Sequence, residues 1–328
     1  MRAIEVHVHG GPDALTPVER DDPMPGPDEV LIRNAYIGVN YVDVQHAAGR
    51  PYPTRVPFVP GTEAAGTVVA GVPGLPAGQR VVHFGHTAGV YAELTAAPRD
   101  FVVALPDAVP LDTAAALTLS GTTAHVLTRV ATQVGPDRTV VVHAAAGATG
   151  WAVSALAAAA GARVVAVVST PAKREHAATA GPAAVIAGQG PELVAAVRAA
   201  TGGRGADVVY DAGGAQTLDT SLRLLADFGM LVLYGQSSGT GGQLDVARLS
   251  GINYPGDAAS TTVKWVAASH YLASGAARAA AAAAVFKDAE AGILQPRVAA
   301  RYPLADAAAA HRRLVDRTNV GKLLLTVG

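Results

Sequence analysis

The pattern of hydrophobic and polar positions divides the chain into two regions with different expected structures. Residues 1 to about 110 contain short alternating or β-branched runs separated by clusters of proline and glycine. Such punctuated runs are typical of an antiparallel, barrel-like domain. The predicted strands are Ala3–Val8, Glu29–Ala35, Gly66–Val69, Arg80–Phe84, Val90–Leu94 and Phe101–Ala104. Leu111–Val134 is predicted to be helical, with a break at Ser120-Gly121.

From Thr139 to about Gly235 the pattern alternates between strands and helices. Runs of the composition of buried parallel strands occur at Thr139–His143, Arg163–Val168, Ala184–Ile186, Asp207–Tyr210 and Met230–Tyr234. Helical stretches lie between them, at Trp151–Ala160, Pro171–Ala180, Pro191–Ala200 and Gln216–Ala226. This alternation predicts an α/β fold with a doubly wound parallel sheet.

The last third of the chain predicts a return to the first region. A flexible loop at Ser237–Gly242 is followed by predicted elements at Ala276–Glu290 (helix), Arg297–Tyr302 (strand), Leu304–Asp316 (helix) and Lys322–Val327 (strand). The simplest architecture is a catalytic barrel domain made of residues 1–122 and 262–328. A nucleotide-binding domain of residues 123–261 interrupts it.

The connection after the strand Thr139–His143 has the shape of a dinucleotide-binding turn. Ala145, Gly147 and Gly150 occupy the three positions of a G-x-G-x-x-G pattern, so the first glycine is an alanine. Gly147 would let the backbone approach a pyrophosphate, and Gly150 would let the following helix pack closely on the strand. The alternative is an ordinary glycine-rich connection in an α/β protein.

Composition narrows the possible functions. The 328 residues have a formal net charge of −1, so no electrostatic surface for nucleic acid or anionic membranes is expected. The absence of cysteine excludes disulfides and thiolate metal sites, and it fits a cytoplasmic enzyme. The N-terminal residues lack the pattern of a signal peptide, and Ala279–Phe286 is too short to span a bilayer.

Several motifs occur in the order found in a known family. They are Gly38-Val39-Asn40-Tyr41-Val42-Asp43, Pro60-Gly61-Thr62-Glu63-Ala64-Ala65-Gly66, Gly121-Thr122-Thr123-Ala124-His125, His143-Ala144-Ala145-Ala146-Gly147, Asp207-Val208-Val209-Tyr210-Asp211, Tyr234-Gly235-Gln236-Ser237-Ser238-Gly239 and Gly321-Lys322-Leu323-Leu324. With them the chain resembles the zinc-independent quinone oxidoreductases, the group including zeta-crystallin, of the medium-chain dehydrogenase/reductase superfamily. The resemblance implies a Rossmann domain inserted into a GroES-like β-barrel domain.

The resemblance also implies an NADPH-dependent reduction of a quinone or an α,β-unsaturated carbonyl. The cofactor-binding residues it implies are Asn40, Thr123, Ala146, Gly147, Ala148, Thr149, Gly150, Ser169, Thr170, Lys173, Arg174, Tyr234, Gly235, Gln236, Ser237 and Lys322. Asp211, which ends a predicted strand before Gly213-Gly214, is interpreted as part of a cofactor-lining turn. The family also suggests a homodimer formed through edge strands near Met230–Tyr234 or the segment after it.

No metal site is expected. Zinc-dependent members of the superfamily have a cysteine where this chain has Val39 or Asn40, and a histidine where it has Thr62. His83 and His86 have H-x-x-H spacing but no third soft ligand nearby, and we interpret them as loop or barrel residues. Without a Lewis acid, hydride delivery to an already conjugated carbon is the accessible chemistry.

Donors beside the substrate oxygen would assist such a reaction. Asn40, Tyr41 and Tyr52 are the candidate catalytic residues, with Gln236 behind them. Asn40 has the alternative role of holding a turn, and Tyr41 that of barrel core. Two positions depart from the family, because Gln45 replaces a frequent tyrosine and Ala47 a frequent arginine. An enoyl-thioester or polyketide-tailoring enone reductase therefore remains an alternative, as does a non-enzymatic NADPH-binding protein of the crystallin or RNA-binding kind.

The residues after the strand Arg163–Val168 favour NADPH over NADH. An NAD enzyme usually carries a carboxylate there, which binds the ribose hydroxyls. This chain has Ser169 and Thr170, followed by Lys173 and Arg174. Hydroxyls and cations suit a 2′-phosphate, although Lys173 and Arg174 also fit an ordinary solvent-facing helix start. One departure from the family lies at Gly188, where a tyrosine is frequent.

Overall fold

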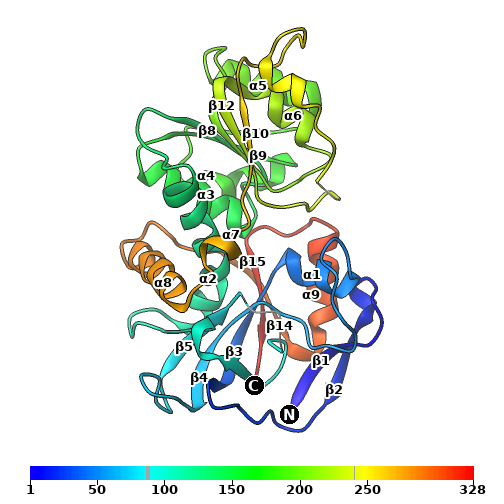
Figure 1. Ribbon diagram of the computed structural model, residues 1–328, viewed down its shortest axis with the longest axis vertical. Coiled ribbons are helices and arrows are strands. Elements are labelled where there is room, and N and C mark those ends of the chain that lie inside the picture. The colour runs from blue at the N-terminus through cyan, green and yellow to red at the C-terminus, as the bar shows by residue number, and fades with distance from the viewer. Residues whose placement is uncertain (86–88, 240) are drawn as a thin grey trace. The chain divides into compact units, whose positions relative to one another are not determined.

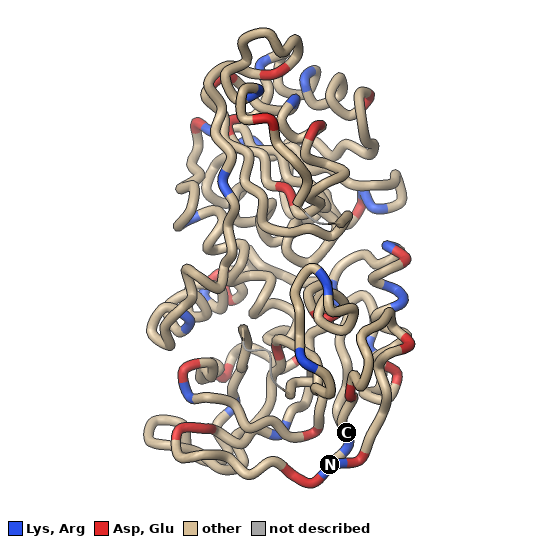
Figure 2. The backbone as a smooth tube through the Cα atoms, turned by 45° about the vertical axis from the view of Figure 1, so that its right-hand side comes forward, with Lys and Arg blue, Asp and Glu red and all other residues tan. Residues whose placement is uncertain are grey.

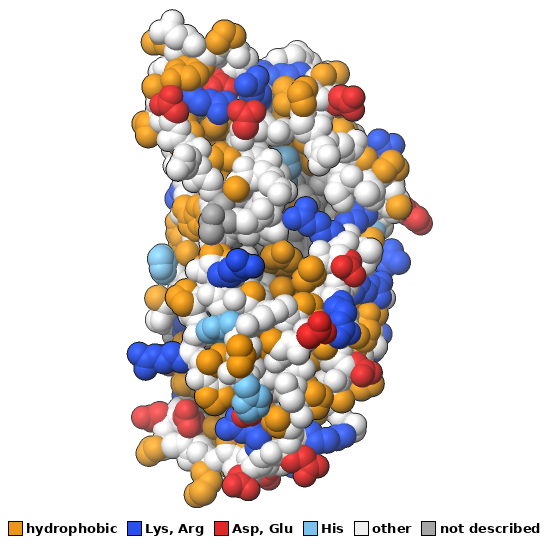
Figure 3. All heavy atoms as spheres, turned by 90° about the vertical axis from the view of Figure 1, so that its right-hand side faces the viewer, with side chains coloured by type: hydrophobic (Ala, Val, Ile, Leu, Met, Phe, Trp, Pro, Cys, Tyr) orange, Lys and Arg blue, Asp and Glu red, His pale blue; other side chains and the backbone are white. Residues whose placement is uncertain are grey.

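The computed structural model describes residues 1–85, 89–239 and 241–328. The chain divides into two compact units (Figure 1). The first unit consists of Met1–Thr122 and Ser269–Gly328, and the second of Thr123–Ala268. Basic and acidic residues are interspersed along both (Figure 2), and the face drawn in Figure 3 likewise mixes the two signs.

The first unit is built on a mainly antiparallel sheet with the order β14-β15-β3-β4-β5-β7, in which β6 also pairs with β3. Its strands are β3 (Glu29–Val39), β4 (Glu63–Ala70), β5 (Arg80–Phe84), β6 (Leu94–Pro98), β7 (Val102–Ala104), β14 (Val298–Pro303) and β15 (Lys322–Thr326). A separate hairpin joins β1 (Arg2–Val6) and β2 (Leu15–Glu19). Strands β15 and β3 are hydrogen-bonded neighbours, so Lys322 begins a strand that runs beside Val39.

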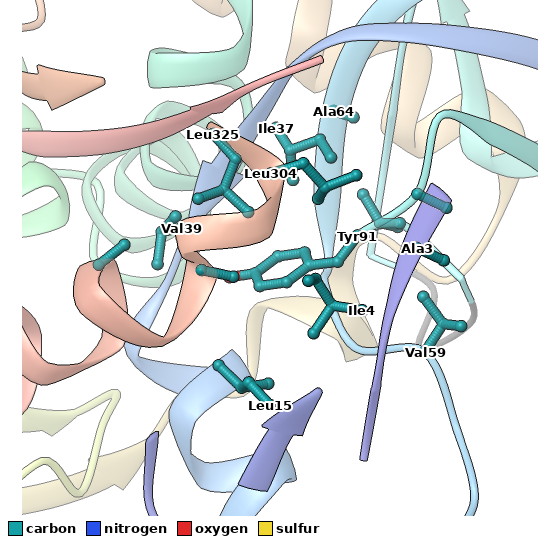
Figure 4. Packing of buried hydrophobic residues seen from close by; sticks show 14 of the residues in the cluster. Ala3, Ile4, Leu15, Ile37, Val39, Val59, Ala64, Tyr91, Leu304 and Leu325 are labelled. Atoms are coloured by element: carbon teal, nitrogen blue, oxygen red, sulfur yellow. The ribbon is translucent and has the colours of Figure 1, made fainter. Parts of the chain in front are cut away.

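The helices of the first unit are α1 (Tyr41–Ala48), most of α2 (Leu111–His125), α8 (Gly275–Glu290) and α9 (Ala307–Val315), with short 3-10 turns at Pro12–Ala14, Arg99–Phe101 and Leu304–Asp306. A buried core of aliphatic side chains from β1, β3, β15 and α9 surrounds Tyr91. Figure 4 shows the Tyr91 ring inside this core, with Ile4 and Leu304 near it.

The second unit is a six-stranded parallel sheet with the order β10-β9-β8-β11-β12-β13. Its strands are β8 (Thr139–Val142), β9 (Arg163–Val168), β10 (Ala184–Ala187), β11 (Ala206–Asp211), β12 (Leu225–Leu233) and β13 (Thr262–Trp265). Its helical segments are α3 (Ala148–Ala159), α4 (Arg174–Ala178), α5 (Gly190–Ala200), α6 (Leu218–Arg223), a π-helical turn at Val126–Ala131, and 3-10 turns at Pro171–Lys173 and Val246–Ser250; α7 (Ala268–Tyr271) begins at its end. In chain order this is the 3-2-1-4-5-6 arrangement of a dinucleotide-binding fold, which confirms the predicted α/β class.

The predicted break in the first long helix is wrong. Helix α2 continues through Ser120 and Gly121 to His125. A Cβ on Gly121 would lie 2.7 Å from Cγ1 of Val285 in α8, so the glycine permits close helix packing. The Ser120 hydroxyl donates to the carbonyl oxygens of Ala116 and Leu117, which keeps it within the helix.

The predicted strand Val90–Leu94 is also misplaced. Strand β6 covers Leu94–Pro98 because these residues pair with β3. Tyr91 lies in an irregular segment, where its N–H donates to Pro60 O and its carbonyl accepts from Ile4 N. The alternating pattern of residues 90–94 therefore identifies buried core residues here, but these residues do not form a strand.

The chain returns to the first unit at Ser269 and not at the expected residue 262. The difference corresponds to one short strand. Residues 262–268 lie in the second unit, because β13 pairs with β12. Strand β12 lies between β11 and β13, so Met230–Tyr234 does not form the predicted sheet edge. The edge strand beyond β12 is β13, which lies in the segment after Met230–Tyr234, the alternative position expected for the dimer contact. Among the helices of the described residues, none is both long and apolar enough to cross a membrane.

Candidate active site

The turn between β8 and α3 lies at the switch point of the parallel sheet, where strand order reverses between β8 and β11. Gly147 caps α3 in an extended conformation, and its N–H donates to Ala144 O at 2.9 Å. The first N–H groups of a helix have no partner within it, so the start of α3 presents donors and a positive dipole end. Ala146 lies in this turn, and Ala148 and Thr149 are the first residues of α3; phosphate binding by these three residues stays a prediction.

Gly150 is required by close packing within the same turn. A Cβ there would lie 2.5 Å from Ala144 O and 3.0 Å from His143 O, too close for any side chain. A Cβ on Gly147 would meet Ala144 O at 3.3 Å, a tight distance that a small shift relieves. Gly150 therefore serves packing, whereas Gly147 leaves open the space in front of the helix start.

This difference predicts that two alanine variants affect different properties, one the stability and the other the affinity for NADPH. Gly150→Ala should lower the free energy of unfolding by about 1–3 kcal/mol, because the added methyl overpacks the turn. Gly147→Ala should retain nearly the wild-type stability but weaken NADPH binding by about tenfold, equivalent to ~1.4 kcal/mol. Chemical denaturation and a fluorescence titration of NADPH distinguish the two. Equal loss of stability in both variants would contradict this division of roles.

A buried polar chain lies behind the turn. The Ser221 hydroxyl donates to Oδ2 of Asp211 at 2.6 Å and lies 3.2 Å from Nε2 of His143. Because an ionised carboxylate only accepts, Ser221 in turn accepts from the His143 Nε2–H. Burial lowers the pKa of His143, which favours its neutral form. Asp211 Oδ1 accepts from Gly213 N and from the Thr217 hydroxyl, so this carboxylate ties the ends of β8 and β11 to α6.

The predicted residues after β12 lie beside the ones after β11. The N–H of Ser237 donates to Ala212 O at 3.0 Å, and its hydroxyl also contacts that carbonyl. A Cβ on Gly235 would lie 2.8 Å from the same oxygen. Among the residues that the structure describes, the buried hydroxyl of Tyr234 finds no hydrogen-bond partner. A buried orphaned hydroxyl at the carboxyl edge of the sheet is a position where a bound group would supply the missing partner.

The predicted ribose-binding residues follow β9. Ser169, Thr170 and Arg174 are exposed, and Lys173 is half-buried at the end of a 3-10 turn. No carboxylate occurs among Ser169–Arg174. Gly188 lies nearby, since its N–H donates to Val168 O at 3.2 Å. The first unit holds none of these residues, and Thr123 starts the second unit within α2.

In the first unit, Asn40 joins a cluster of buried polar side chains. Its Nδ2 donates to Glu63 Oε1 at 2.9 Å, with longer contacts to Gly38 O and the Thr62 hydroxyl. Its Oδ1 accepts from the Lys322 ammonium at 2.6 Å. Lys322 and Glu63 form an ion pair whose side chains are 2% and 1% exposed. These contacts give Lys322 buried partners inside the first unit, and its contact with the cofactor stays a prediction.

Tyr41 is the first residue of α1 and is half-buried, whereas Tyr52 is 37% exposed. The Tyr52 ring packs edge-on against His46, with 6.1 Å between ring centroids. The two tyrosines are thus not equivalent candidates, because Tyr52 is the more exposed of the two. Ala47 is fully buried, so its difference from the family arginine changes packing, while Gln45 is half-buried.

A hydrogen-bonded chain extends inward from this cluster. Asp43 Oδ1 accepts from the Thr62 hydroxyl at 2.8 Å, and Oδ2 accepts from Asn40 N and from the Tyr91 hydroxyl. The Tyr91 oxygen also lies 3.0 Å from Nε2 of His311. Burial raises the pKa of Asp43 to about 6 and lowers the pKa of His311 to about 4. Both groups therefore favour their neutral forms more than in water.

Comparisons with known proteins identify the family. Residues 148–255 match the zinc-binding dehydrogenase family, and residues 26–107 match the alcohol dehydrogenase GroES-like domain. A 2-haloacrylate reductase from a Burkholderia species is 35% identical to this chain, and the match covers 99% of this chain and 98% of the reductase. Quinone oxidoreductase 1 of Escherichia coli is 34% identical, covering 98% of both. The chain belongs to the quinone oxidoreductase family of medium-chain dehydrogenases and reductases.

The fold of this family agrees along the whole chain. The crystal structure of Escherichia coli quinone oxidoreductase complexed with NADPH superposes with a TM-score of 0.94 at 33% identity, covering 100% of each chain. The expected family and the expected combination of a GroES-like domain with a Rossmann sheet are confirmed.

The residues considered for zinc in this quinone oxidoreductase family member have other partners. Thr62 donates to Asp43, and Asn40 is held by Lys322 and Glu63. His83 is buried in β5, where Nε2 lies 2.8 Å from Asn34 Oδ1. His86 lies outside the described residues. Among the described residues, no group of three or more histidines, cysteines or carboxylates is placed to hold a metal.

Sequence reasoning named Lys322 but missed its buried partner Glu63, and it also missed Ser221. Glu63 and Lys322 are 259 positions apart, so their ion pair has no local signature. The available signal was the presence of a charged residue within an apolar strand, because buried charges are normally paired. Ser221 had no comparable signal, since a serine on a helix is usually exposed.

Proposed function

We propose that this protein is a cytoplasmic NADPH-dependent reductase of quinones or α,β-unsaturated carbonyl compounds. The observation that carries the proposal is the turn between β8 and α3 at the sheet's switch point, where Gly150 has no room for a Cβ and the helix start offers free donors. The orphaned hydroxyl of Tyr234 at the same edge fits a ligand that supplies a partner. Full-length similarity to a quinone oxidoreductase solved with NADPH supports it.

The donors at the start of α3 would hold the pyrophosphate, together with Ala146, Gly147, Ala148, Thr149 and Gly150. Ser169, Thr170, Lys173 and Arg174 would hold the 2′-phosphate. Thr123, Tyr234, Gly235, Gln236 and Ser237 remain candidates for the rest of the cofactor. When bound, NADPH supplies a hydride to the conjugated carbon of the substrate.

Reduction of a conjugated carbon leaves negative charge on the substrate oxygen. A hydrogen-bond donor near that oxygen would stabilise the charge. We assign this role to Asn40, Tyr41 and Tyr52. Asn40 offers its second amide hydrogen, whose hydrogen bonds of 3.2 and 3.3 Å are longer than the 2.9 Å bond to Glu63. Tyr52 offers the hydroxyl of a residue that is 37% exposed.

A panel of substrates with NADPH consumption as the readout tests the proposal. We expect turnover with 1,4-naphthoquinone or with a simple enone such as methyl vinyl ketone. The panel includes 2-chloroacrylate, because the similarity to a 2-haloacrylate reductase favours an unsaturated acid as a second candidate substrate. An enoyl thioester covers the carrier-bound alternative. NADPH binding without turnover of any member would leave a non-enzymatic binding protein.

Turnover is expected to be independent of zinc. Thr62 and Asn40 are engaged with carboxylate and ammonium partners, and the chain has no cysteine. Exhaustive dialysis against a chelator should leave both the unfolding midpoint and kcat unchanged. Stoichiometric zinc in the purified protein, lost together with activity, would overturn this expectation.

We further propose that the protein is a homodimer assembled through β13. This strand is a sheet edge, and its Trp265 is 43% exposed. An exposed edge with an aromatic residue is commonly covered by pairing. Light scattering at micromolar concentration should give twice the 33.0 kDa chain mass. Trp265→Glu should shift the mass toward the monomer, while Met24→Glu, at another exposed apolar position, should not. A monomeric wild type would contradict the proposal.

A further inference from the structure

Asn40 is the half-buried member of a polar cluster that is otherwise buried. Asp43, Thr62, Glu63 and Lys322 are all at most 5% exposed. Within the cluster, Asn40 is therefore the residue that is not fully buried. The orientation of its side-chain amide decides whether a donor or an acceptor is presented.

The ion pair beside Asn40 determines that orientation. An ammonium group only donates, so it requires the Asn40 oxygen, and a carboxylate only accepts, so it requires the Asn40 nitrogen. The observed contacts follow this rule: Lys322 donates to Oδ1 at 2.6 Å, and Nδ2 donates to Glu63 Oε1 at 2.9 Å. Rotating the amide by 180° would break two charge-assisted hydrogen bonds. It would also place the amide nitrogen against the Lys322 ammonium and the amide oxygen against the Glu63 carboxylate.

We propose that Lys322 and Glu63 form a positioning pair, which holds the Asn40 amide so that an N–H donor is presented to the substrate oxygen. This inference rests on the proposed function. Both members act through Asn40, because they are themselves buried. The second amide hydrogen is the one that would turn to the substrate oxygen, since its hydrogen bonds to Gly38 O and Thr62 Oγ1, at 3.2 and 3.3 Å, are longer than the 2.9 Å bond to Glu63.

The pair is itself fixed by the backbone. The second carboxylate oxygen of Glu63 accepts from Leu119 N in α2 at 2.7 Å. A Cβ on Gly38 would lie 2.4 Å from Glu63 Oε1 and 2.5 Å from Ala115 O, so only glycine leaves room for this carboxylate. Lys322 begins β15, whose next residue, Leu323, pairs with Val39. Rigid elements therefore hold both charges beside Asn40.

A double-mutant cycle on turnover tests the positioning role. Glu63→Gln combined with Lys322→Met removes both charges while keeping similar volumes, which avoids leaving one unpaired buried charge. We expect kcat for 1,4-naphthoquinone to fall by about 10- to 100-fold with little change in KM, because the donor loses its fixed direction. Asn40→Ala should have a similar effect. Adding the pair substitution to Asn40→Ala should cause no further loss.

Two outcomes would overturn the inference. They are an unchanged kcat in the pair variant, and a full additional loss of kcat when the pair is removed in the Asn40→Ala background. The matched control is Arg248→Met with Asp257→Asn, which removes another largely buried ion pair, in the second unit. It should leave kcat unchanged.

Two further measurements test the positioning role even if the pair variant does not fold. If the pair variant fails to fold, Glu63→Gln alone serves, and Lys322→Arg, which keeps a cationic donor, should retain more activity than it. NMR of the Asn40 side-chain amide should show two well-separated proton shifts in the wild type that move closer together in the variant. Unchanged amide shifts would contradict the inference, whereas a wild type inactive on every substrate would refute the proposed function alone.

Discussion

Lys173→Ala is expected to weaken NADPH binding by about 10- to 150-fold, the equivalent of losing one charged hydrogen bond of roughly 1.5–3 kcal/mol. Lys173 is half-buried near the carboxyl end of β9, beside the exposed Ser169 and Thr170. A cation there would neutralise the 2′-phosphate of NADPH, which NADH lacks. NADH binding should therefore barely change.

Fluorescence titration of both cofactors measures this difference. Arg163→Ala is a suitable control, because it removes an exposed cation at the opposite end of the same strand. It should leave both affinities unchanged. Equal losses for NADPH and NADH in Lys173→Ala, or a wild-type preference for NADH, would show that the 2′-phosphate is not bound there.

Replacing Asp43 or His311 is expected to change the pH dependence of stability in opposite directions. Burial raises the pKa of Asp43 from 3.8 to about 6, and it lowers the pKa of His311 from 6.5 to about 4. Tyr91 connects the two side chains. The charged neighbours of Asp43 in this cluster are Lys322 and Glu63.

The sign follows from the protons bound in each state. Between about pH 6 and 4 the folded protein binds a proton at Asp43, which stabilises it as the pH falls. Over nearly the same range the unfolded chain binds a proton at His311, which destabilises the folded protein. Each effect is worth about 3 kcal/mol at ~1.4 kcal/mol per pKa unit. In the wild type the two contributions largely cancel.

Chemical denaturation between pH 7 and 4 measures the effect as a difference from wild type. Relative to wild type, Asp43→Asn should lose about 3 kcal/mol as the pH falls, because the stabilising proton uptake is gone. His311→Phe should gain about as much over the same range. Parallel curves for all three proteins would mean that neither group titrates as its burial implies.

The second unit was largely predictable because its signals are local. Strand β9 has the predicted range Arg163–Val168, and the turn at Gly147 and Gly150 combines a strand, two glycines and a helix within a dozen residues. The short edge strand β13 was missed. Its four residues are too few for a period to be recognised, and pairing with β12 defines it.

The first unit was less predictable because distant residues decide its details. Strand β6 contains small residues and a proline, and it forms because it pairs with β3. Gly121 resembles a helix breaker in sequence, yet packing against Val285 explains it. Asn40 was identified as a candidate from the family motif. Its partners Glu63 and Lys322 come from other strands, so the orientation of its amide is visible only in the structure.

Isotope transfer tests most directly whether this protein transfers a hydride from NADPH to a conjugated carbon. The measurement uses NADPH deuterated at the transferable C4 position, an enone substrate, and mass spectrometry with NMR of the product. We expect one deuterium at the carbon β to the carbonyl, with one NADP⁺ formed per product. Oxidation of NADPH without deuterium in the product, or no oxidation at all, would contradict it.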